Sequence, residues 1–224
     1  MKLALFDLDN TLLPIDSDYC WGVFIQKLGW IDDEELKAQN EAFYRQYINQ
    51  ELDVYAYIEY VSSILRAQGL EEAIQAREQF MQDVIYPAIQ PQAQALVDKY
   101  QQSGYECILV TSTNDFIVLP IAAQFGFKYL IATNLCYDFF GDLTGDVIGM
   151  PAFREGKVTR VEQWLTTKGE SWESLEDCIF FSDSVNDLPL LEKVQKAVAT
   201  NPEPKLAAIA KERNWEILEL FAKP

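Results

Sequence analysis

The beginning of this 224-residue chain constrains its fold more than any other stretch, because an apolar run leads directly into two closely spaced aspartates. Residues Leu3 to Phe6 are typical of a buried strand in a parallel sheet. Asp7 and Asp9 follow this run, and ligands of open α/β sheets bind at the carboxyl ends of the strands. Two carboxylates held so close repel each other unless a cation neutralises them or one keeps its proton. The pattern therefore favours a cation site with an acid–base pair, although acidic residues after a strand also serve as helix caps.

The second part of the chain repeats the pattern of an apolar strand followed by polar residues and a helix. Strands are predicted over residues 105–110, 128–131, 178–181 and 196–199, with an edge strand over 215–218. Helices are predicted over 92–102, 116–125, 155–165 and 188–194, with another from a cap at 201–202 to about 213, and a β-hairpin around 140–145. Because strands and helices alternate, we predict an α/β protein with a doubly wound, mainly parallel sheet.

Residues 15–86 interrupt this alternation with helical segments and no predicted strand. The predicted helices are Tyr19–Leu28, Asp32–Gln50, Val54–Gln68 and Glu71–Val84. Four helices placed straight after the first strand indicate a helical bundle inserted into the α/β domain. The predicted organisation is therefore a core of residues 1–14 and 87–224 with a helical cap of residues 15–86.

The composition excludes several classes of function. The chain contains no histidine, so it can form neither a histidine-based catalytic triad nor a histidine-ligated zinc site. Its net charge of −17 argues against nucleic acids and anionic membranes as partners, and an anionic substrate would need positive charge supplied locally. The four cysteines stand far apart without metal-binding spacing, no export signal precedes the first strand, and no run approaches ~20 apolar residues. These features predict a cytoplasmic protein with reduced thiols.

Polar residues at four places complete the pattern that the first strand begins. In chain order these are Asp7 with Asp9, Thr111 after the second strand, Lys157 at a helix start, and Asp183 with Asp187 after a later strand. The ordered set resembles the four motifs of the haloacid dehalogenase (HAD) superfamily, whose members share a Rossmann-like core. The resemblance covers essentially the whole chain. The place of the helical insert resembles the phosphoserine-phosphatase-like branch, subfamily IB, and the stretch Asp7–Phe24 is similar to a bacterial group that includes histidinol-phosphatases.

This resemblance implies phosphoryl transfer to and from a carboxylate. Asp7 is the expected nucleophile, which forms an aspartyl-phosphate, and Asp9 is the expected general acid and base. Thr111, with the neighbouring Ser112, is expected to hold a phosphate oxygen, and Lys157 to supply fixed positive charge.

The resemblance also implies a Mg²⁺ cofactor. The expected metal ligands are Asp7, the backbone carbonyl of Asp9 and Asp183, and Asp187 is expected to support the metal site through water or Lys157. Hard oxygen ligands select Mg²⁺ over softer metals. The predicted protein is a Mg²⁺-dependent phosphomonoesterase that acts on a small phosphorylated metabolite.

Residues at the start of the first cap helix bear on the substrate. Asp16 lies nine residues after Asp7, where phosphoserine phosphatases place a glutamate that binds the substrate amine. A carboxylate there, with Asp18 beside it, suits an aminoalkyl phosphate, and Trp21 could stack on an imidazole ring. The alternative is that Asp16 and Asp18 only cap the helix.

Three hypotheses follow. The first is a phosphatase for histidinol phosphate, which has no carboxylate and needs no arginine to bind one; we favour it. The second is the same chemistry, or a phosphotransferase reaction, on phosphoserine or another small ester, which a cap arginine near Asp7 would favour; the candidates are Arg45, Arg66 and Arg77. The third is a non-catalytic HAD-fold binding protein, which a missing nucleophile or acid would favour. The sequence does not indicate the oligomeric state.

Overall fold

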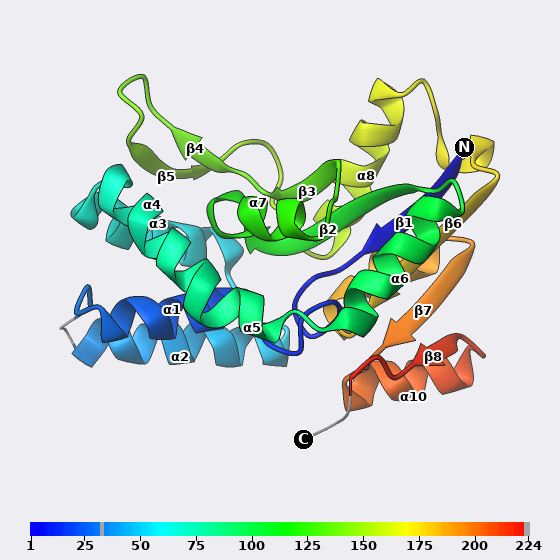
Figure 1. Cartoon of the computed structure of the whole chain (residues 1–224), viewed down its shortest axis with the longest axis horizontal. Helices are drawn as coiled ribbons and strands as arrows, with labels where there is room; N and C mark the ends of the chain where they lie inside the picture. The colour runs from blue at the N-terminus through cyan, green and yellow to red at the C-terminus, as the bar shows by residue number, and fades with distance from the viewer. Residues whose placement is uncertain (32–33, 222–224) are drawn as a thin grey trace.

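The computed structural model describes residues 1–31 and 34–221, without the side chains of residues 35–37. Its centre is a sheet of six parallel strands in the order β3-β2-β1-β6-β7-β8 (Figure 1). The strands are β1 (Lys2–Phe6), β2 (Glu106–Asn114), β3 (Tyr129–Thr133), β6 (Asp177–Ser182), β7 (Lys196–Thr200) and β8 (Glu216–Leu218). Because strand order runs outward from β1 in both directions, the predicted doubly wound, mainly parallel sheet is confirmed.

Strand β1 is apolar on both sides because it lies in the middle of the sheet. Ala4 and Phe6 belong to the hydrophobic cluster on one face, and Leu3 and Leu5 belong to the cluster on the other. Phe6 stacks on Phe181 of the neighbouring β6, with 4.9 Å between the ring centroids. This packing fixes the end of β1, and so fixes where the residues after Phe6 leave the sheet.

Helices cover both faces of the sheet. The cluster around Phe6 receives α6 (Pro91–Gln102) and α7 (Asp115–Gln124). The opposite cluster receives α8 (Glu155–Thr167), α9 (Leu188–Lys193) and α10 (Pro204–Glu212). Two short 3₁₀ segments, η2 (Trp172–Ser174) and η3 (Val185–Asp187), precede β6 and α9.

The chain between β1 and α6 is helical and lies beside the carboxyl end of β1 (Figure 1). It comprises α1 (Ser17–Lys27), α2 (Glu34–Asn49), α3 (Val54–Gln68), α4 (Leu70–Phe80), the π-helical η1 (Met81–Ile85) and α5 (Tyr86–Ala88). Trp21 of α1 packs against Phe80 of α4 and Phe116 of α7, at 5.4 and 5.9 Å between ring centroids. The inserted helices therefore share one hydrophobic core with the sheet. Among the described helices, none combines the length and apolar character that a membrane crossing requires.

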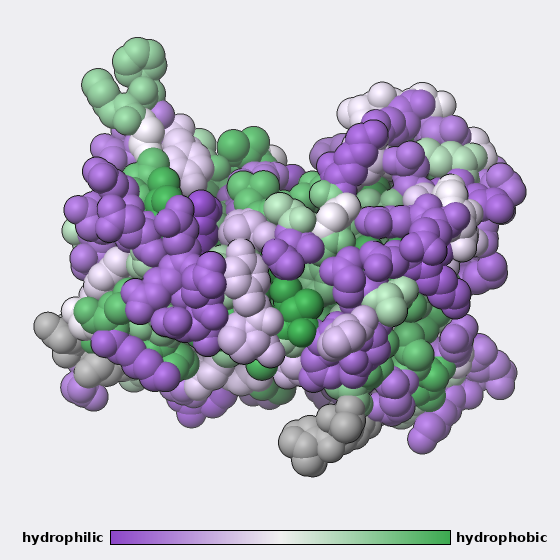
Figure 2. Space-filling view, in the orientation of Figure 1, coloured by the Kyte–Doolittle hydropathy of each residue, from purple (hydrophilic) through white to green (hydrophobic). Residues whose placement is uncertain are grey.

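A separate antiparallel hairpin follows β3. Its strands are β4 (Leu135–Tyr137) and β5 (Leu143–Val147), and β5 lies along α3, where Nη1 of Arg66 donates to the carbonyl of Leu143 at 3.1 Å. Between the strands, Phe139 and Phe140 are 95% and 85% exposed. This apolar tip stands out from a mostly hydrophilic face of the molecule (Figure 2).

Strand β2 differs from the sequence prediction because it is longer. A register shift after Val110 lets Asn114 pair with Thr133 of β3, so the strand continues to Asn114. Thr111 therefore lies within the strand, near its carboxyl end, and not in a loop after it.

Helix ends also differ from the prediction. The predicted helix over residues 71–84 becomes α4 followed by the π-helical η1. Helix α10 begins at Pro204, and Glu203 occupies its N-cap position without a side-chain capping hydrogen bond. Asn201 does not cap this helix, and its Oδ1 accepts from the backbone N–H of Leu220 and Phe221. The predicted start of a helix at Asp32 lies outside the described residues, and the described helix begins at Glu34.

Candidate active site

The end of β1 meets a buried lysine of α8. Lys157 is 1% exposed, and its Nζ lies 2.8 Å from Oδ1 of Asp7 and 2.7 Å from Oδ1 of Asp187. Burial acts to lower the pKa of Lys157, but the charges of Asp187 and Asp7 outweigh it and hold the pKa above its usual value. The lysine therefore keeps its charge and presents it beside Asp7.

Asp7 is held in one orientation by contacts to both of its carboxylate oxygens. Lys157 binds Oδ1, and Oγ1 of Thr11 donates to Oδ2 at 3.1 Å. Burial raises the pKa of Asp7 to about 7, although Lys157 acts to lower it; Asp187 and Asp9 add to the increase. An added cation would favour the ionised form that a nucleophile requires.

Thr11 connects Asp7 to Asp183, which follows β6. Its Oγ1 lies 3.2 Å from Oδ1 of Asp183 and accepts from the backbone N–H of Asp183 at 3.0 Å. One hydroxyl proton can serve only one carboxylate at a time, so the other carboxylate has no proton from Thr11. Burial, with the charges of Asp7 and Asp187, raises the pKa of Asp183 well above its usual value. Two hard oxygen donors that face each other in this way fit Mg²⁺.

The oxygen donors for a metal would come from few residues. Within the described part of the chain, no group of three or more acidic or cysteine side chains forms a metal-binding cluster. Of the predicted ligands, the side chains of Asp7 and Asp183 are brought together through Thr11, and the backbone carbonyl of Asp9 stays a prediction. Asp187 is placed differently: both of its oxygens contact Lys157, and Oδ2 also accepts from Ser182 at 2.7 Å. Asp187 therefore acts on the site through Lys157.

Asp9 contacts the start of the inserted helices, and its hydrogen-bond partners among the described residues include no lysine or arginine. Its carboxylate accepts from the backbone N–H of Ser17 at 2.7 Å and from Oγ1 of Thr113 at 2.8 Å. Burial and the charge of Asp16 raise the pKa of Asp9 to about 7, while these hydrogen bonds act to lower it. A carboxyl group with this pKa can both give and take a proton near neutral pH, as a general acid and base must.

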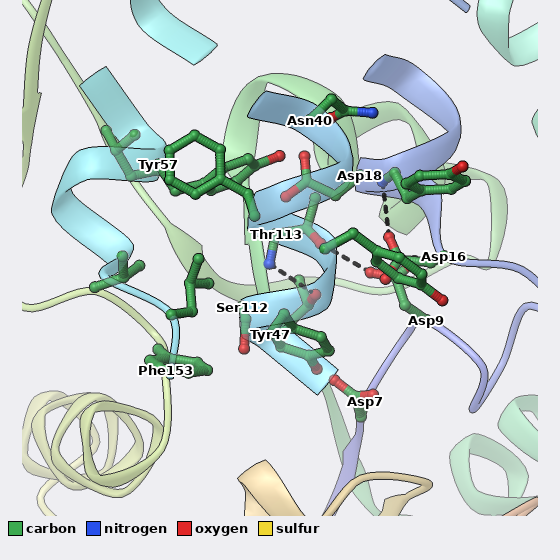
Figure 3. A pocket seen from close by; sticks show the side chains of 17 residues that line it. Asp7, Asp9, Asp16, Asp18, Asn40, Tyr47, Tyr57, Ser112, Thr113 and Phe153 are labelled. Atoms are coloured by element: carbon green, nitrogen blue, oxygen red, sulfur yellow. Dashed lines mark hydrogen bonds between the residues drawn. The ribbon is translucent and has the colours of Figure 1, made fainter. Parts of the chain in front are cut away.

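The end of β2 supplies polar groups to the same place. The register pairs Phe6 with Leu109, which brings Thr111 to the edge of the sheet where Asp7 lies. Thr111 is 1% exposed, and its Oγ1 accepts from the backbone N–H of Thr113 at 3.2 Å. Thr111, Ser112 and Thr113 all line the pocket above Asp7 (Figure 3).

This pocket lies between the sheet edge and the inserted helices and encloses about 670 Å³, its open mouth included. Figure 3 shows the carboxyl groups of Asp9, Asp16 and Asp18 on one side and Tyr57 and Phe153 on the other. The aromatic residues that line it come mainly from the inserted helices α1, α2 and α3: Tyr19, Phe43, Tyr44, Tyr47, Tyr57 and Phe153. None of the described residues that line the pocket is a lysine or an arginine.

Asp16 and Asp18 both line the pocket but are held differently. Asp16 caps α1, since its Oδ1 accepts from the backbone N–H of Tyr19 at 2.8 Å. Asp18 does not cap the helix; it interacts with the hydroxyl of Tyr57 and lies 3.5 Å from Nδ2 of Asn114. Burial raises the pKa of each carboxyl group to about 7. The capping interpretation therefore applies to Asp16, whereas Asp18 lines the pocket with Tyr57 and Asn114 as its polar contacts.

The structure does not bring Trp21 into this pocket. Its side chain is 2% exposed and packs against Phe24, Phe80 and Phe116, which places it in the hydrophobic core. It lines a second, smaller cavity that shares Asp18 with the main pocket. Trp21 lies about one helical turn after Asp18, but its side chain faces the packed interior of the bundle and not the pocket. The sequence pattern alone could not distinguish these two environments.

The three candidate arginines are also engaged elsewhere. Arg45 donates to a backbone carbonyl within α2, Arg66 reaches Glu59 and the β4–β5 hairpin, and Arg77 donates to the backbone of α7. None of the three lines the pocket.

Sequence reasoning missed several residues that contact the site. Thr11 contacts Asp7 and Asp183, and its place at the end of the first motif was the sequence signal that could have identified it. Thr113 and Tyr57 carried no distinctive sequence signal, because their contacts to Asp9 and Asp18 join segments far apart in the chain.

Comparisons with known proteins agree with this geometry. Residues 4–192 match the family described as haloacid dehalogenase-like hydrolase. A histidinol-phosphatase of Neisseria meningitidis serogroup C (strain 8013) is 43% identical over 217 residues, which cover 97% of this chain and 98% of that protein.

Solved structures show the same fold. A protein of unknown function from Bordetella pertussis Tohama I superposes with a TM-score of 0.92 at 43% identity, covering 98% of this chain and 99% of that one. A phospho-aspartyl intermediate analogue of phosphoserine phosphatase superposes with a TM-score of 0.65 at 21% identity, covering 99% and 94%.

Proposed function

The chain belongs to the haloacid dehalogenase-like hydrolase family and is a phosphatase of that family, and we propose that it is a Mg²⁺-dependent phosphomonoesterase acting on histidinol phosphate through an aspartyl-phosphate on Asp7. The relative that is 43% identical over nearly the whole chain supports this substrate.

The observation that carries the substrate proposal is the chemistry of the pocket wall. Carboxylates and aromatic rings line the space beside Asp7, and the described lining residues include no lysine or arginine. Such a surface attracts a cationic or partly cationic leaving group through charge and cation–π contacts. A carboxylate on the leaving group would meet Asp16 and Asp18 without a cation to offset them. Histidinol phosphate, with an amine and an imidazole but no carboxylate, suits this pocket better than phosphoserine.

The proposed reaction has two steps at phosphorus. A carboxylate oxygen of Asp7 attacks phosphorus, the bond to the leaving alcohol breaks, and Asp9 gives its proton to the departing oxygen. Asp9 then takes a proton from water, which attacks the phosphorus of the aspartyl-phosphate, releases phosphate and restores Asp7. Thr111, Ser112 and Lys157 hold the oxygens on which negative charge builds.

Magnesium would be held by Asp7, Asp183 and the backbone carbonyl of Asp9, where it would neutralise the phosphate and the nucleophile. Asp187 keeps Lys157 charged and in place.

We further propose that residues 15–86 act as the cap that forms the leaving-group side of the pocket, on a core of residues 1–14 and 87–224. Eleven of the pocket-lining residues come from residues 16–58, whereas Asp7, Asp9, Thr111, Ser112, Thr113 and Phe153 come from the core. Free Cys107 and Cys178, both buried, support our proposal of a cytoplasmic, reducing location.

The test is phosphate release in the presence of Mg²⁺ from histidinol phosphate, phosphoserine, phosphothreonine, glycerol phosphate and sugar phosphates. We expect the highest kcat/KM for histidinol phosphate. Asp7→Asn should lose turnover but keep the wild-type circular dichroism spectrum, because the amide is a poor nucleophile of the same size. Preference for phosphoserine would overturn the substrate proposal, and Mg²⁺-dependent turnover by Asp7→Asn would overturn the nucleophile.

A further inference from the structure

Two polar side chains from loops beside the active site bind the C-terminal end of α2. Nη2 of Arg154 donates to the carbonyl of Gln50, and Nδ2 of Asn186 donates to the carbonyl of Tyr47 at 3.2 Å. Nε of Arg154 also donates to Oδ1 of Asn186 at 3.4 Å, which joins the two side chains. The carbonyl of Tyr47 also accepts from the backbone N–H of Gln50, and the second lone pair of a carbonyl oxygen leaves room for the bond from Asn186.

The backbone of Arg154 has a conformation that glycine adopts more easily. Its φ is 52° and its ψ is −120°, and the carbonyl of Phe153 accepts from the N–H of Gly156 at 2.9 Å. Arg154 is thus the first central residue of a type II′ turn, a position that favours glycine because a side chain is strained there. An arginine at such a position indicates that its side chain makes a contact that glycine could not make.

The same two residues stand next to the catalytic machinery. Lys157 follows Arg154 by one helical turn, and Asp187 follows Asn186 directly. On the cap side, the ring of Phe153 lies 6.2 Å from the ring of Tyr47 and 4.8 Å from the guanidinium of Arg154. Phe153 and Tyr47 both line the pocket.

Helix α2 forms one wall of the pocket above Asp7. Asn40, Phe43, Tyr44 and Tyr47 all lie on this helix and line the pocket. Among the described residues, the ring contacts of Phe43 and Tyr44 and the side-chain hydrogen bond of Glu41 go to α1 and α3, which belong to the same insert. The hydrogen bonds from Arg154 and Asn186 therefore set where this wall stands relative to the core.

We propose that Arg154 and Asn186 form a latch that fixes the end of α2 against the core and so shapes the leaving-group pocket, with Arg154 as a positioning residue that does not touch the reacting atoms. Release of the latch frees Tyr47 from its place opposite Phe153. The latch ties this wall of the pocket to the start of α8, which carries Lys157, and to η3, which carries Asp187.

The first test is hydrogen exchange in the full-length protein without substrate. In the wild type, the amides of Gln50 and Glu51 are protected by bonds to the carbonyls of Tyr47 and Gln46 at 3.1 and 2.8 Å. Arg154→Gly should raise their exchange rates about tenfold or more, since the helix end loses its anchor. The melting temperature should stay the same or rise, because glycine relieves the turn, and this separates latch release from general unfolding.

The control is Arg45→Gln on the same helix. Arg45 is exposed and donates only to the carbonyl of Glu41 among the described contacts, so its loss should leave the exchange of Gln50 and Glu51 unchanged. Arg154→Lys keeps one donor but cannot bridge to both Gln50 and Asn186, and we expect an intermediate exchange rate. Wild-type exchange at Gln50 and Glu51 in Arg154→Gly would overturn the latch.

The second test uses turnover of histidinol phosphate and rests on the proposed function, whereas the exchange test does not. We expect Arg154→Gly to raise KM about tenfold with a smaller decrease in kcat, because the pocket wall is displaced while Asp7 and Asp9 are intact. Arg154→Lys should recover part of the loss, and Arg45→Gln should match the wild type. Raised exchange with unchanged KM and kcat would overturn the role of Arg154 as a positioning residue.

Discussion

Lys157 shows how the site keeps charged groups buried. An isolated lysine with 1% exposure would tend to lose its proton, but here two carboxylates contact its Nζ within 2.8 Å. Removal of one partner from these ion pairs would leave a buried charge without compensation, which typically costs about 3–5 kcal/mol. The three side chains therefore act as a unit, and the fixed charge beside the nucleophile exists because the acidic residues around it are also buried.

The different contacts of Asp16 and Asp18 indicate different roles for these two carboxylates, and a substitution of Asp18 can test this. Asp16 is occupied as the cap of α1, so we propose Asp18 as the carboxylate that binds a cationic leaving group. Asp18→Asn keeps the size of the side chain and removes its charge. We expect kcat/KM for histidinol phosphate to fall about 10–100-fold, which corresponds to ~1.4–2.8 kcal/mol. The value for p-nitrophenyl phosphate, whose leaving group carries no cationic group, should change about twofold or less.

Two comparisons make the Asp18 experiment specific. Asp83→Asn removes an exposed charge from the same helical insert, outside the residues that line the pocket, and should affect neither substrate. Equal losses for the two esters in Asp18→Asn would mean that Asp18 supports the fold of the pocket and does not recognise a cationic leaving group.

At the scale of secondary-structure elements, helix α3 of the insert packs against strand β5 of the hairpin. Alanine substitutions of two glycines in the hairpin can test this contact. Gly145 has φ +93°, and a Cβ there would meet Oε2 of Glu59 at 1.6 Å; Gly141 has φ +90° with nothing within 4 Å. Both alanine variants carry the strain of positive φ, about 1–2 kcal/mol. Gly145→Ala must also displace Glu59 from Arg66, so we expect roughly 1 kcal/mol of further destabilisation in urea unfolding. Equal stability of the two variants would show that β5 does not pack on α3 in solution.

The strands of the sheet could be predicted from local sequence, because their apolar composition follows from their burial. The apolar run before Asp7 and the later apolar runs became strands, since each is buried on both faces of the sheet. The site was partly predictable for the same reason: the parallel register brings Asp7, Thr111 and Asp183 to one edge.

Contacts between segments distant in the sequence could not be predicted in this way. The local pattern around Trp21 fits either a pocket wall or a core, and only its packing against Phe80 and Phe116 decides for the core. Likewise, Arg154 and Gln50 are 104 residues apart, and their hydrogen bond depends on where α2 lies over the loop before α8. Such contacts follow from tertiary packing, which periodicity does not encode.

For the molecule as a whole, the concentration of carboxyl groups at one end of the sheet makes stability depend on pH. Burial is the largest cause that raises the pKa of Asp7, Asp9, Asp16 and Asp18, each from 3.8 to about 7. Between about pH 4 and pH 7 the native state therefore binds protons that the unfolded chain has released. Stability then decreases as the pH rises through this window, because the unfolded state binds fewer protons than the native state. The net charge of −17 acts in the same direction.

The resulting prediction concerns the protein without metal. In EDTA, the melting temperature should be lower at about pH 8 than at about pH 5.5 by roughly 5–10 °C, a value that allows for solvent around the half-buried Asp16 and Asp18. Mg²⁺ should restore most of the loss at the higher pH and little at the lower pH, since it binds the ionised carboxylates of the native state. Differential scanning calorimetry at both pH values, with Na⁺ at equal ionic strength as the control, measures this difference. A melting temperature that rises with pH in EDTA, or equal effects of Na⁺ and Mg²⁺, would contradict a cation site built from Asp7 and Asp183.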